Sequence, residues 1–176
     1  ESLKVARELS RLIAEEEARK DKGKESYLPA PLWSMIRFGQ GHEMLREPAP
    51  NKNLRLHQGI WRLGRGLALA ATGRLPGAEG EHAVLAGMAK RLGRDRTPEE
   101  KTERALLKIA ERLLAGEIAA RHRKYDEAIT CFKDAVKLED GLSYMEPPFW
   151  PIPVRHYLGD ILLVAGRPAD AEAVYR

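Results

Sequence analysis

The feature that most constrains this chain is a spacing of small residues that recurs along it. A glycine follows a first small residue by seven positions, and an alanine follows that residue by twelve. In another set, Gly116 and Ala128 have the same spacing and Arg123 stands where the turn glycine would be. Antiparallel helices approach closely where both carry small side chains, so the spacing predicts helical hairpins with the first glycine opposite the alanine. The two complete sets are Gly66, Gly73 and Ala78, and Gly159, Gly166 and Ala171.

The composition favours an all-α fold. Leucine and alanine occur 23 times each, whereas valine occurs 6 times and isoleucine 8 times. Leucine and alanine are good helix formers, while strands draw on β-branched and aromatic residues. Loop signals rich in glycine and proline separate the amphipathic stretches, and Thr97-Pro98-Glu99-Glu100 reads as a helix start with a capping box.

We expect residues 1–176 to form a single array of helical hairpins. Counting from the small-residue sets gives steps of 34, 50 and 43 residues between units, so two units carry insertions. The expected parts are a helix from a preceding repeat (1–22), a degenerate repeat (25–58), a repeat (59–92), a repeat with an extended first helix (98–142), and a proline-rich strap with a truncated repeat (144–176).

These offsets resemble the tetratricopeptide repeat, a family of 34-residue helix–turn–helix units. Over residues 25–176, and most clearly in the runs 144–150 and 171–176, the chain looks like the last repeats of a group of uncharacterised bacterial tetratricopeptide proteins. The resemblance implies a right-handed α-solenoid that acts as a scaffold for protein binding, and it brings no catalytic residues. The chain departs from the pattern at Met44, which replaces a small residue, and at His82, which occupies an aromatic position.

A repeat array binds partners on its concave surface, because each hairpin presents its first helix there. We therefore expect a groove with an apolar floor and charges that orient a peptide or partner protein. The other interpretation is that these charges pair only with one another or with water. The expected partner-binding residues are Glu117, Arg121, His156 and Asp160, with Leu63, Leu67 and Ala70 as the apolar floor.

Charge suggests a second function. Residues 31–96 carry 11 basic and 5 acidic residues in a chain of net charge +4, and several of the basic ones fall between residues 52 and 74. This region is an alternative site for nucleic acid or an acidic partner. A third hypothesis is that the chain is the non-catalytic part of a larger enzyme.

Motifs for catalysis or cofactor binding are missing from the sequence. The five histidines show no metal-ligand spacing, the single cysteine Cys131 excludes a multi-cysteine site, and the glycine pairs lack the context of a phosphate-binding loop. We therefore predict no enzyme activity, no catalytic residue, no metal and no cofactor.

The proline-rich segment 146–153 has two interpretations. It is either a structural strap, with Phe149 and Trp150 packed over neighbouring helices, or a pocket wall that contacts a partner. The strap is favoured because the two aromatics directly precede an apolar helix.

The sequence gives no sign of a membrane segment. No apolar run approaches the roughly 18 residues that span a bilayer, and the run 12–14 is too short for a signal-peptide core. We expect no membrane insertion, and a cytoplasmic location is favoured.

Overall fold

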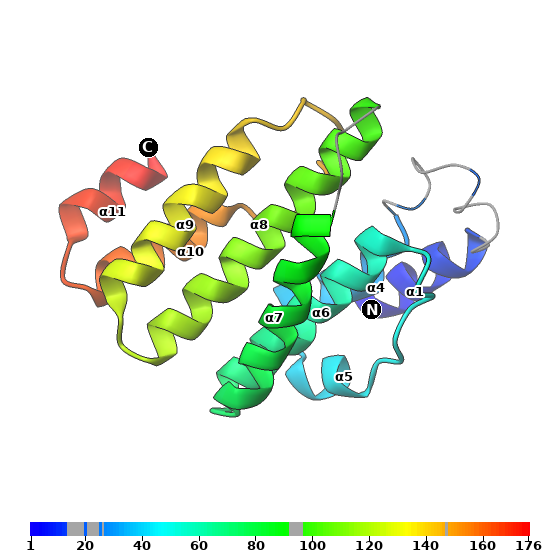
Figure 1. Cartoon of the computed structure of the whole chain (residues 1–176), viewed down its shortest axis with the longest axis horizontal. Helices are drawn as coiled ribbons and strands as arrows, with labels where there is room; N and C mark the ends of the chain where they lie inside the picture. Colours follow the sequence, from blue (N-terminus) through cyan, green and yellow to red (C-terminus); the bar gives the residue numbers. More distant parts are fainter. Residues whose placement is uncertain (14–19, 21–24, 26, 92–96, 147) are drawn as a thin grey trace.

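Figure 1 shows the computed structural model of the chain, which describes residues 1–13, 20, 25, 27–91, 97–146 and 148–176. Within these ranges the regular secondary structure is helical and no strand forms, so the prediction of an all-α fold is confirmed. The helices are α1 (Ser2–Leu12), α4 (Ala30–Arg37), α5 (Gly41–Arg46), α6 (Arg55–Ala71), α7 (Leu75–Arg91), α8 (Pro98–Arg121), α9 (Tyr125–Asp140), α10 (Val154–Val164) and α11 (Pro168–Tyr175).

Successive helices pair as hairpins that follow one another along the molecule. Helix α6 packs on α7, α8 on α9, and α10 on α11, while α8 also contacts α6 and α7 of the hairpin before it. Helices α1 and α11 lie at opposite ends of the molecule (Figure 1). One cluster of buried apolar side chains extends from Leu32 to Ala171. Each hairpin therefore completes its core against its neighbours.

Four helix ends share one turn geometry, centred on Gly39, Gly73, Arg123 and Gly166. All four residues have a left-handed φ between 60° and 75°, and they are 34, 50 and 43 residues apart. In each turn the next residue donates its backbone N–H to the carbonyl oxygen five residues earlier, at 2.8 to 2.9 Å. This bond is typical of the Schellman helix end. Arg123 thus takes the turn position despite the strain that its side chain adds.

The glycines of the repeated spacing are buried at helix contacts, but their nearest neighbours differ from the prediction. A Cβ on Gly116 would lie 2.5 Å from Phe132 Cε1, and one on Gly159 would lie 2.2 Å from Tyr175 Cζ. The aromatic ring four residues after the predicted alanine therefore covers each glycine. Ala128 and Ala171 are buried beside these rings.

In the hairpin of α6 and α7, a different residue covers the glycine. Its equivalent of the aromatic position is His82, whose Nε2 lies 2.9 Å from Glu111 Oε1 on α8. The space over Gly66 is filled by Leu114, whose Cδ2 would lie 2.5 Å from a Cβ on that glycine. A side chain from the next hairpin thus replaces the missing aromatic.

The hairpin of α4 and α5 accommodates Met44, which stands where the repeat pattern has a small residue. Met44 on α5 is 1% exposed, and its Sδ would lie 2.5 Å from a Cβ on Gly64 of α6. The large side chain at Met44 therefore fits because a glycine faces it. Helix α5 ends at Arg46, two residues before Pro48, which cannot continue a helix.

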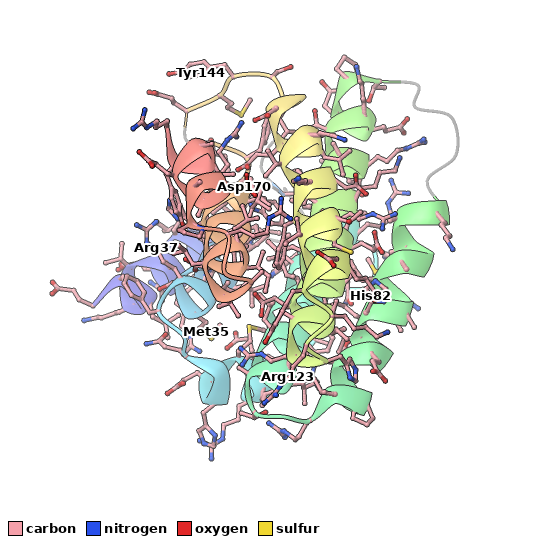
Figure 2. The ribbon with its side chains drawn as sticks, turned by 90° about the vertical axis from the view of Figure 1, so that its left-hand side faces the viewer. Met35, Arg37, His82, Arg123, Tyr144 and Asp170 are labelled. Carbon is pink, nitrogen blue, oxygen red and sulfur yellow. The ribbon has the colours of Figure 1, made fainter. Side chains whose placement is uncertain are left out.

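The two aromatics of the proline-rich segment pack over other helices, as the strap interpretation expects. Trp150 is 4% exposed and meets the ring of Trp33 edge-on, with 4.7 Å between ring centroids. Phe149 packs against the same core, whereas Tyr144, two residues before the segment, extends outward (Figure 2). The aromatics of this loop thus tie the last hairpins to α4.

Two further expectations concern the ends of helices. The side chain of Thr97 accepts the backbone N–H of Glu100 at 3.2 Å, so Thr97 is the N-cap predicted for α8. The expected helix 1–22 is described as α1 over Ser2–Leu12, and most of its remainder lies outside the described residues. None of the described helices combines the length and apolar character needed to cross a membrane.

Replacing Gly116 with alanine should destabilise the protein. The added methyl group would meet the buried ring of Phe132, which cannot move away freely, and we expect a loss of about 1–3 kcal/mol. Gly80 is a matched control, because it also lies inside a helix and a Cβ there meets nothing within 4 Å. Gly80→Ala should gain about 0.5–1 kcal/mol from helix propensity. Chemical denaturation measures both; equal effects would contradict the close contact at Gly116.

Candidate functional site

Three of the four predicted partner-binding residues line one cavity between α8, α9 and α10. Glu117 and Arg121 reach it from the last turns of α8, and Asp160 reaches it from α10 of the next hairpin. The cavity has a volume of about 250 Å³. The other described residues that line it are Ala120, Tyr125, Phe132, Tyr157, Ile161 and Val164.

The fourth predicted residue, His156, is not among the cavity-lining residues. Its ring lies beside that of Tyr175, with 6.3 Å between centroids. The Tyr175 hydroxyl donates to Asp160 Oδ1 at 3.2 Å and is 3.4 Å from the backbone oxygen of His156. Tyr175 therefore links His156 to Asp160 at the cavity.

The predicted apolar floor lies elsewhere. Leu63 and Ala70 are almost fully buried in the core, and Leu67 packs against that core. The apolar walls of the cavity come instead from α9 and α10, notably Phe132 and Ile161. Leu63, Leu67 and Ala70 are therefore part of the helix packing and do not form an open floor.

The carboxylate of Glu117 is largely withdrawn from water. Burial raises its pKa, the guanidinium of Arg121 opposes that rise, and the negative charge of Asp160 adds to it. Arg121 Nη2 lies 3.9 Å from Glu117 Oε2, at the outer limit of an ion pair, and the arginine side chain is half exposed. Burial, with the charges of Glu117 and Asp160, also raises the pKa of Tyr157 to about 12. The cavity therefore disfavours added negative charge.

Sequence reasoning missed the tyrosines and Phe132 of this cavity. Tyr157 lies three residues before Asp160 on the same helix, so the 3–4 spacing of one helical face was the available signal. Phe132, which covers Gly116, also forms part of the cavity wall. Its ring lies 6.0 Å from that of Tyr157, centroid to centroid.

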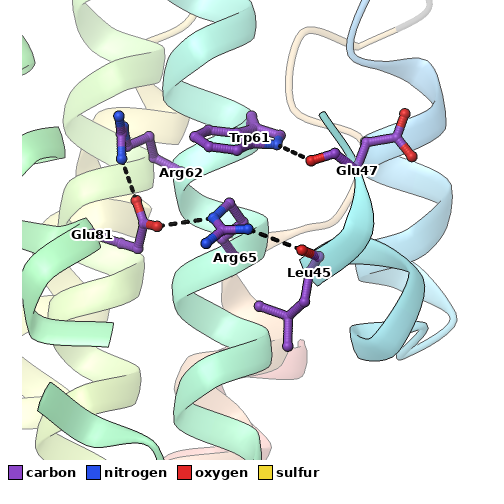
Figure 3. A network of polar contacts seen from close by, with 6 residues as sticks. All are labelled: Leu45, Glu47, Trp61, Arg62, Arg65 and Glu81. Atoms are coloured by element: carbon purple, nitrogen blue, oxygen red, sulfur yellow. Dashed lines mark hydrogen bonds and ion pairs between the residues drawn. The ribbon is translucent and has the colours of Figure 1, made fainter. Parts of the chain in front are cut away.

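The basic segment 52–74 forms contacts within the chain rather than an open charged face. Arg62 Nη1 and Arg65 Nε donate to the two oxygens of Glu81 on α7, at 2.6 and 2.9 Å (Figure 3). Both guanidinium groups also lie over the ring of Trp61, at 5.1 and 4.8 Å from its centroid. Ion pairing and cation–π contact thus hold both guanidinium groups against the chain, although Glu81 supplies only one negative charge to the two of them.

The same network anchors the loop after α5. Arg65 Nη1 donates to the backbone oxygen of Leu45 at 3.1 Å, and Trp61 Nε1 donates to that of Glu47 at 3.0 Å (Figure 3). Outside the network, Arg55 Nε pairs with Glu103 at 3.0 Å. Three arginines of the basic segment therefore have carboxylate partners in their own chain.

The strap borders a second hollow. A cavity of about 280 Å³ lies between the end of α9 and the strap, lined by residues that include Glu139, Met145 and Trp150. Tyr144 is 88% exposed at its edge. Both interpretations of the segment thus find support: Phe149 and Trp150 pack against the core, and Glu146 and Pro148 border the hollow.

Replacing Glu117 with glutamine should stabilise the fold at neutral pH. Because burial raises the folded-state pKa above 4.5, the folded protein holds this proton more tightly than the unfolded chain does. Ionising Glu117 therefore penalises folding above that pH, and the neutral amide removes the penalty. The melting temperature of Glu117→Gln should exceed that of the wild type at about pH 7. The difference should shrink as the pH falls toward 4.5.

Glu111 on the same helix is the matched control with the opposite sign. Its hydrogen bond with His82 is the largest cause of a pKa below 4.5, so its stabilising effect is present above that pH and is lost as the pH falls through the folded-state value. Glu111→Gln should therefore melt below the wild type at about pH 7. Shifts of the same sign in both variants would contradict this account.

Removing Glu81 should lower the free energy of unfolding more than removing a surface carboxylate from the same helix does. Glu81→Ala leaves Arg62 and Arg65 close together without their counter-charge, and we expect a loss of about 2 kcal/mol. Glu79 forms only an exposed pair with His122, so Glu79→Ala should cost less than about 1 kcal/mol. Urea unfolding measures both, and a cost at Glu81 no larger than at Glu79 would mean that the network contributes little.

No family model, curated protein or solved structure matches this chain. The likeness to tetratricopeptide proteins therefore rests on the residues of the chain itself. What supports a function is the packing of its helices and the side chains that they bring together.

Proposed function

We propose that the chain is a right-handed α-solenoid of tetratricopeptide-like hairpins that acts as a protein-interaction scaffold. The recurrence of one helix-ending turn at Gly39, Gly73, Arg123 and Gly166 supports the repeat architecture. So does the ring-over-glycine contact in two hairpins. The proposal assigns no catalysis, metal or cofactor to this chain.

The observation that carries the functional proposal is the cavity shared by two consecutive hairpins. Glu117 and Arg121 come from one hairpin and Asp160 from the next, while Phe132 and Ile161 supply apolar walls. Ligand sites commonly combine apolar walls with a few polar groups that fix orientation. A segment of a partner protein fits this description, because one side chain can enter while the backbone crosses the rim.

The alternative site in the basic segment 52–74 receives less support. Nucleic acid binding depends on lysine and arginine side chains that are free to meet phosphates. Arg62 and Arg65 are held by Glu81, and Arg55 by Glu103. A role as the non-catalytic part of a larger enzyme is compatible with the scaffold and adds no site in this chain.

Filling the cavity should abolish partner binding without unfolding the protein. Val164 lines the cavity and is 63% exposed, so Val164→Trp places an indole at its mouth at little cost to stability. Random peptides displayed on phage would be selected on the wild type and then measured against the variant. We expect the selected peptides to bind Val164→Trp at least about tenfold more weakly.

The adjacent residue provides the control. Leu163 is 52% exposed on the same helix but is not among the lining residues, so Leu163→Trp should leave affinity unchanged. Circular dichroism should show equal helicity in both variants. If selection yields no peptides that distinguish Val164→Trp from Leu163→Trp, the cavity is not the binding site and the proposal fails.

A further inference from the structure

The charges around the cavity do not balance. Of the described side chains that line it, Glu117 and Asp160 are carboxylates, and Arg121 is the one guanidinium. Arg121 lies 3.9 Å from Glu117 and its side chain is 49% exposed, so it neutralises that carboxylate only weakly. The site is therefore short of one positive charge near its wall.

Burial strengthens the electrostatic effect of this charge imbalance. The side chain of Glu117 is 22% exposed, so water screens its charge poorly. The negative charge of Asp160 acts on both Glu117 and Tyr157, and raises the pKa of each. A cation that entered between the two carboxylates would relieve this repulsion, whereas an anion would add to it.

The remaining walls suit an organic cation. Tyr125, Phe132 and Tyr157 place three aromatic rings around the cavity, and aromatic rings attract ammonium and guanidinium groups. Ile161 and Val164 give an apolar surface on which an alkyl chain can lie. Lysine and arginine side chains combine a positive head with such a chain.

We propose that this cavity binds a basic side chain, lysine or arginine, from a segment of the partner protein. The cationic head lies between Glu117 and Asp160, and its alkyl stem rests on Ile161 and Val164. This inference rests on the scaffold function proposed above and names the chemistry that the scaffold recognises.

The position of Arg121 predicts how its removal changes the affinity for a basic side chain. Arg121 follows Glu117 by one helical turn and reaches it from the rim, so it competes with an incoming cation for the same carboxylate. Removing Arg121 should strengthen binding of a basic side chain. Removing either carboxylate should weaken that binding. Each of the three substitutions removes one charge from the cavity, but the expected effects on affinity have opposite signs.

The test uses four pools of capped peptides, acetylated at the N-terminus and amidated at the C-terminus. Each pool has random flanking residues and one fixed central residue: lysine, arginine, norleucine or glutamate. Fluorescence anisotropy should show that the wild type binds the lysine and arginine pools at least about tenfold more tightly than the norleucine pool. Norleucine is the key comparison, because it keeps the alkyl stem of lysine and lacks the charge.

Single variants then assign the preference to residues. Glu117→Gln and Asp160→Asn should each reduce the preference for lysine over norleucine, and Arg121→Gln should increase it. Asp170→Asn is the matched control: it removes an equal charge from α11, where Asp170 pairs with Arg167 outside the cavity. The preference should be unchanged in that variant.

The other possible outcomes separate a failure of the cation inference from a failure of the scaffold proposal. If the norleucine or glutamate pool binds as tightly as the lysine pool and Val164→Trp still blocks binding, the cation inference is overturned while the scaffold function stands. If no pool binds the wild type better than Val164→Trp, the scaffold function itself fails at this site. If spermidine binds more tightly than the lysine pool and displaces it, the ligand is a free polyamine, and the assignment to a partner protein is overturned.

Discussion

The contact between an aromatic ring and a glycine sets the geometry on which the last two hairpins depend. The rings of Phe132 and Tyr175 lie where a Cβ on Gly116 or Gly159 would be, so each pair of helices can approach only because the glycine has none. Both rings also serve the cavity: Phe132 forms part of its wall, and Tyr175 donates to Asp160. The interaction that holds these hairpins together therefore also shapes the site between them.

The sequence predicted the parts of the fold that depend on backbone conformation. A turn that needs a left-handed φ selects glycine, so Gly73 and Gly166 marked two turns directly, and equal spacing located Arg123 in a third. The partner of each buried glycine was harder to predict, because offsets along a helix give the face of a residue but not the reach of its neighbours. Leu114 over Gly66 comes from the next hairpin, which no spacing within a repeat could indicate.

The candidate site could also be predicted only in part from the sequence. Helical periodicity placed Glu117 and Arg121 on one face of α8, and the equivalent position in the next repeat added Asp160; the three line one cavity. The periodicity gave no sign that the ring of His156 lies beside that of Tyr175 and not in the cavity wall. Charge counts were still less informative: the basic surplus of residues 31–96 suggested an open surface, whereas Arg62 and Arg65 share Glu81. Pairing depends on which helices meet, and composition does not record that.

Two charged clusters of the described chain differ in how their carboxylates are paired, and this difference is the basis for proposing a ligand at one of them. Glu81 is 10% exposed and has two arginines at 2.6 and 2.9 Å, so its charge is fully matched within the chain. Glu117 is 22% exposed and has one arginine at 3.9 Å, with Asp160 nearby as a second negative charge. A buried carboxylate is stabilised only by nearby positive charge or hydrogen bonds. The first cluster already contains that charge, whereas the second can obtain it from a basic side chain of another molecule.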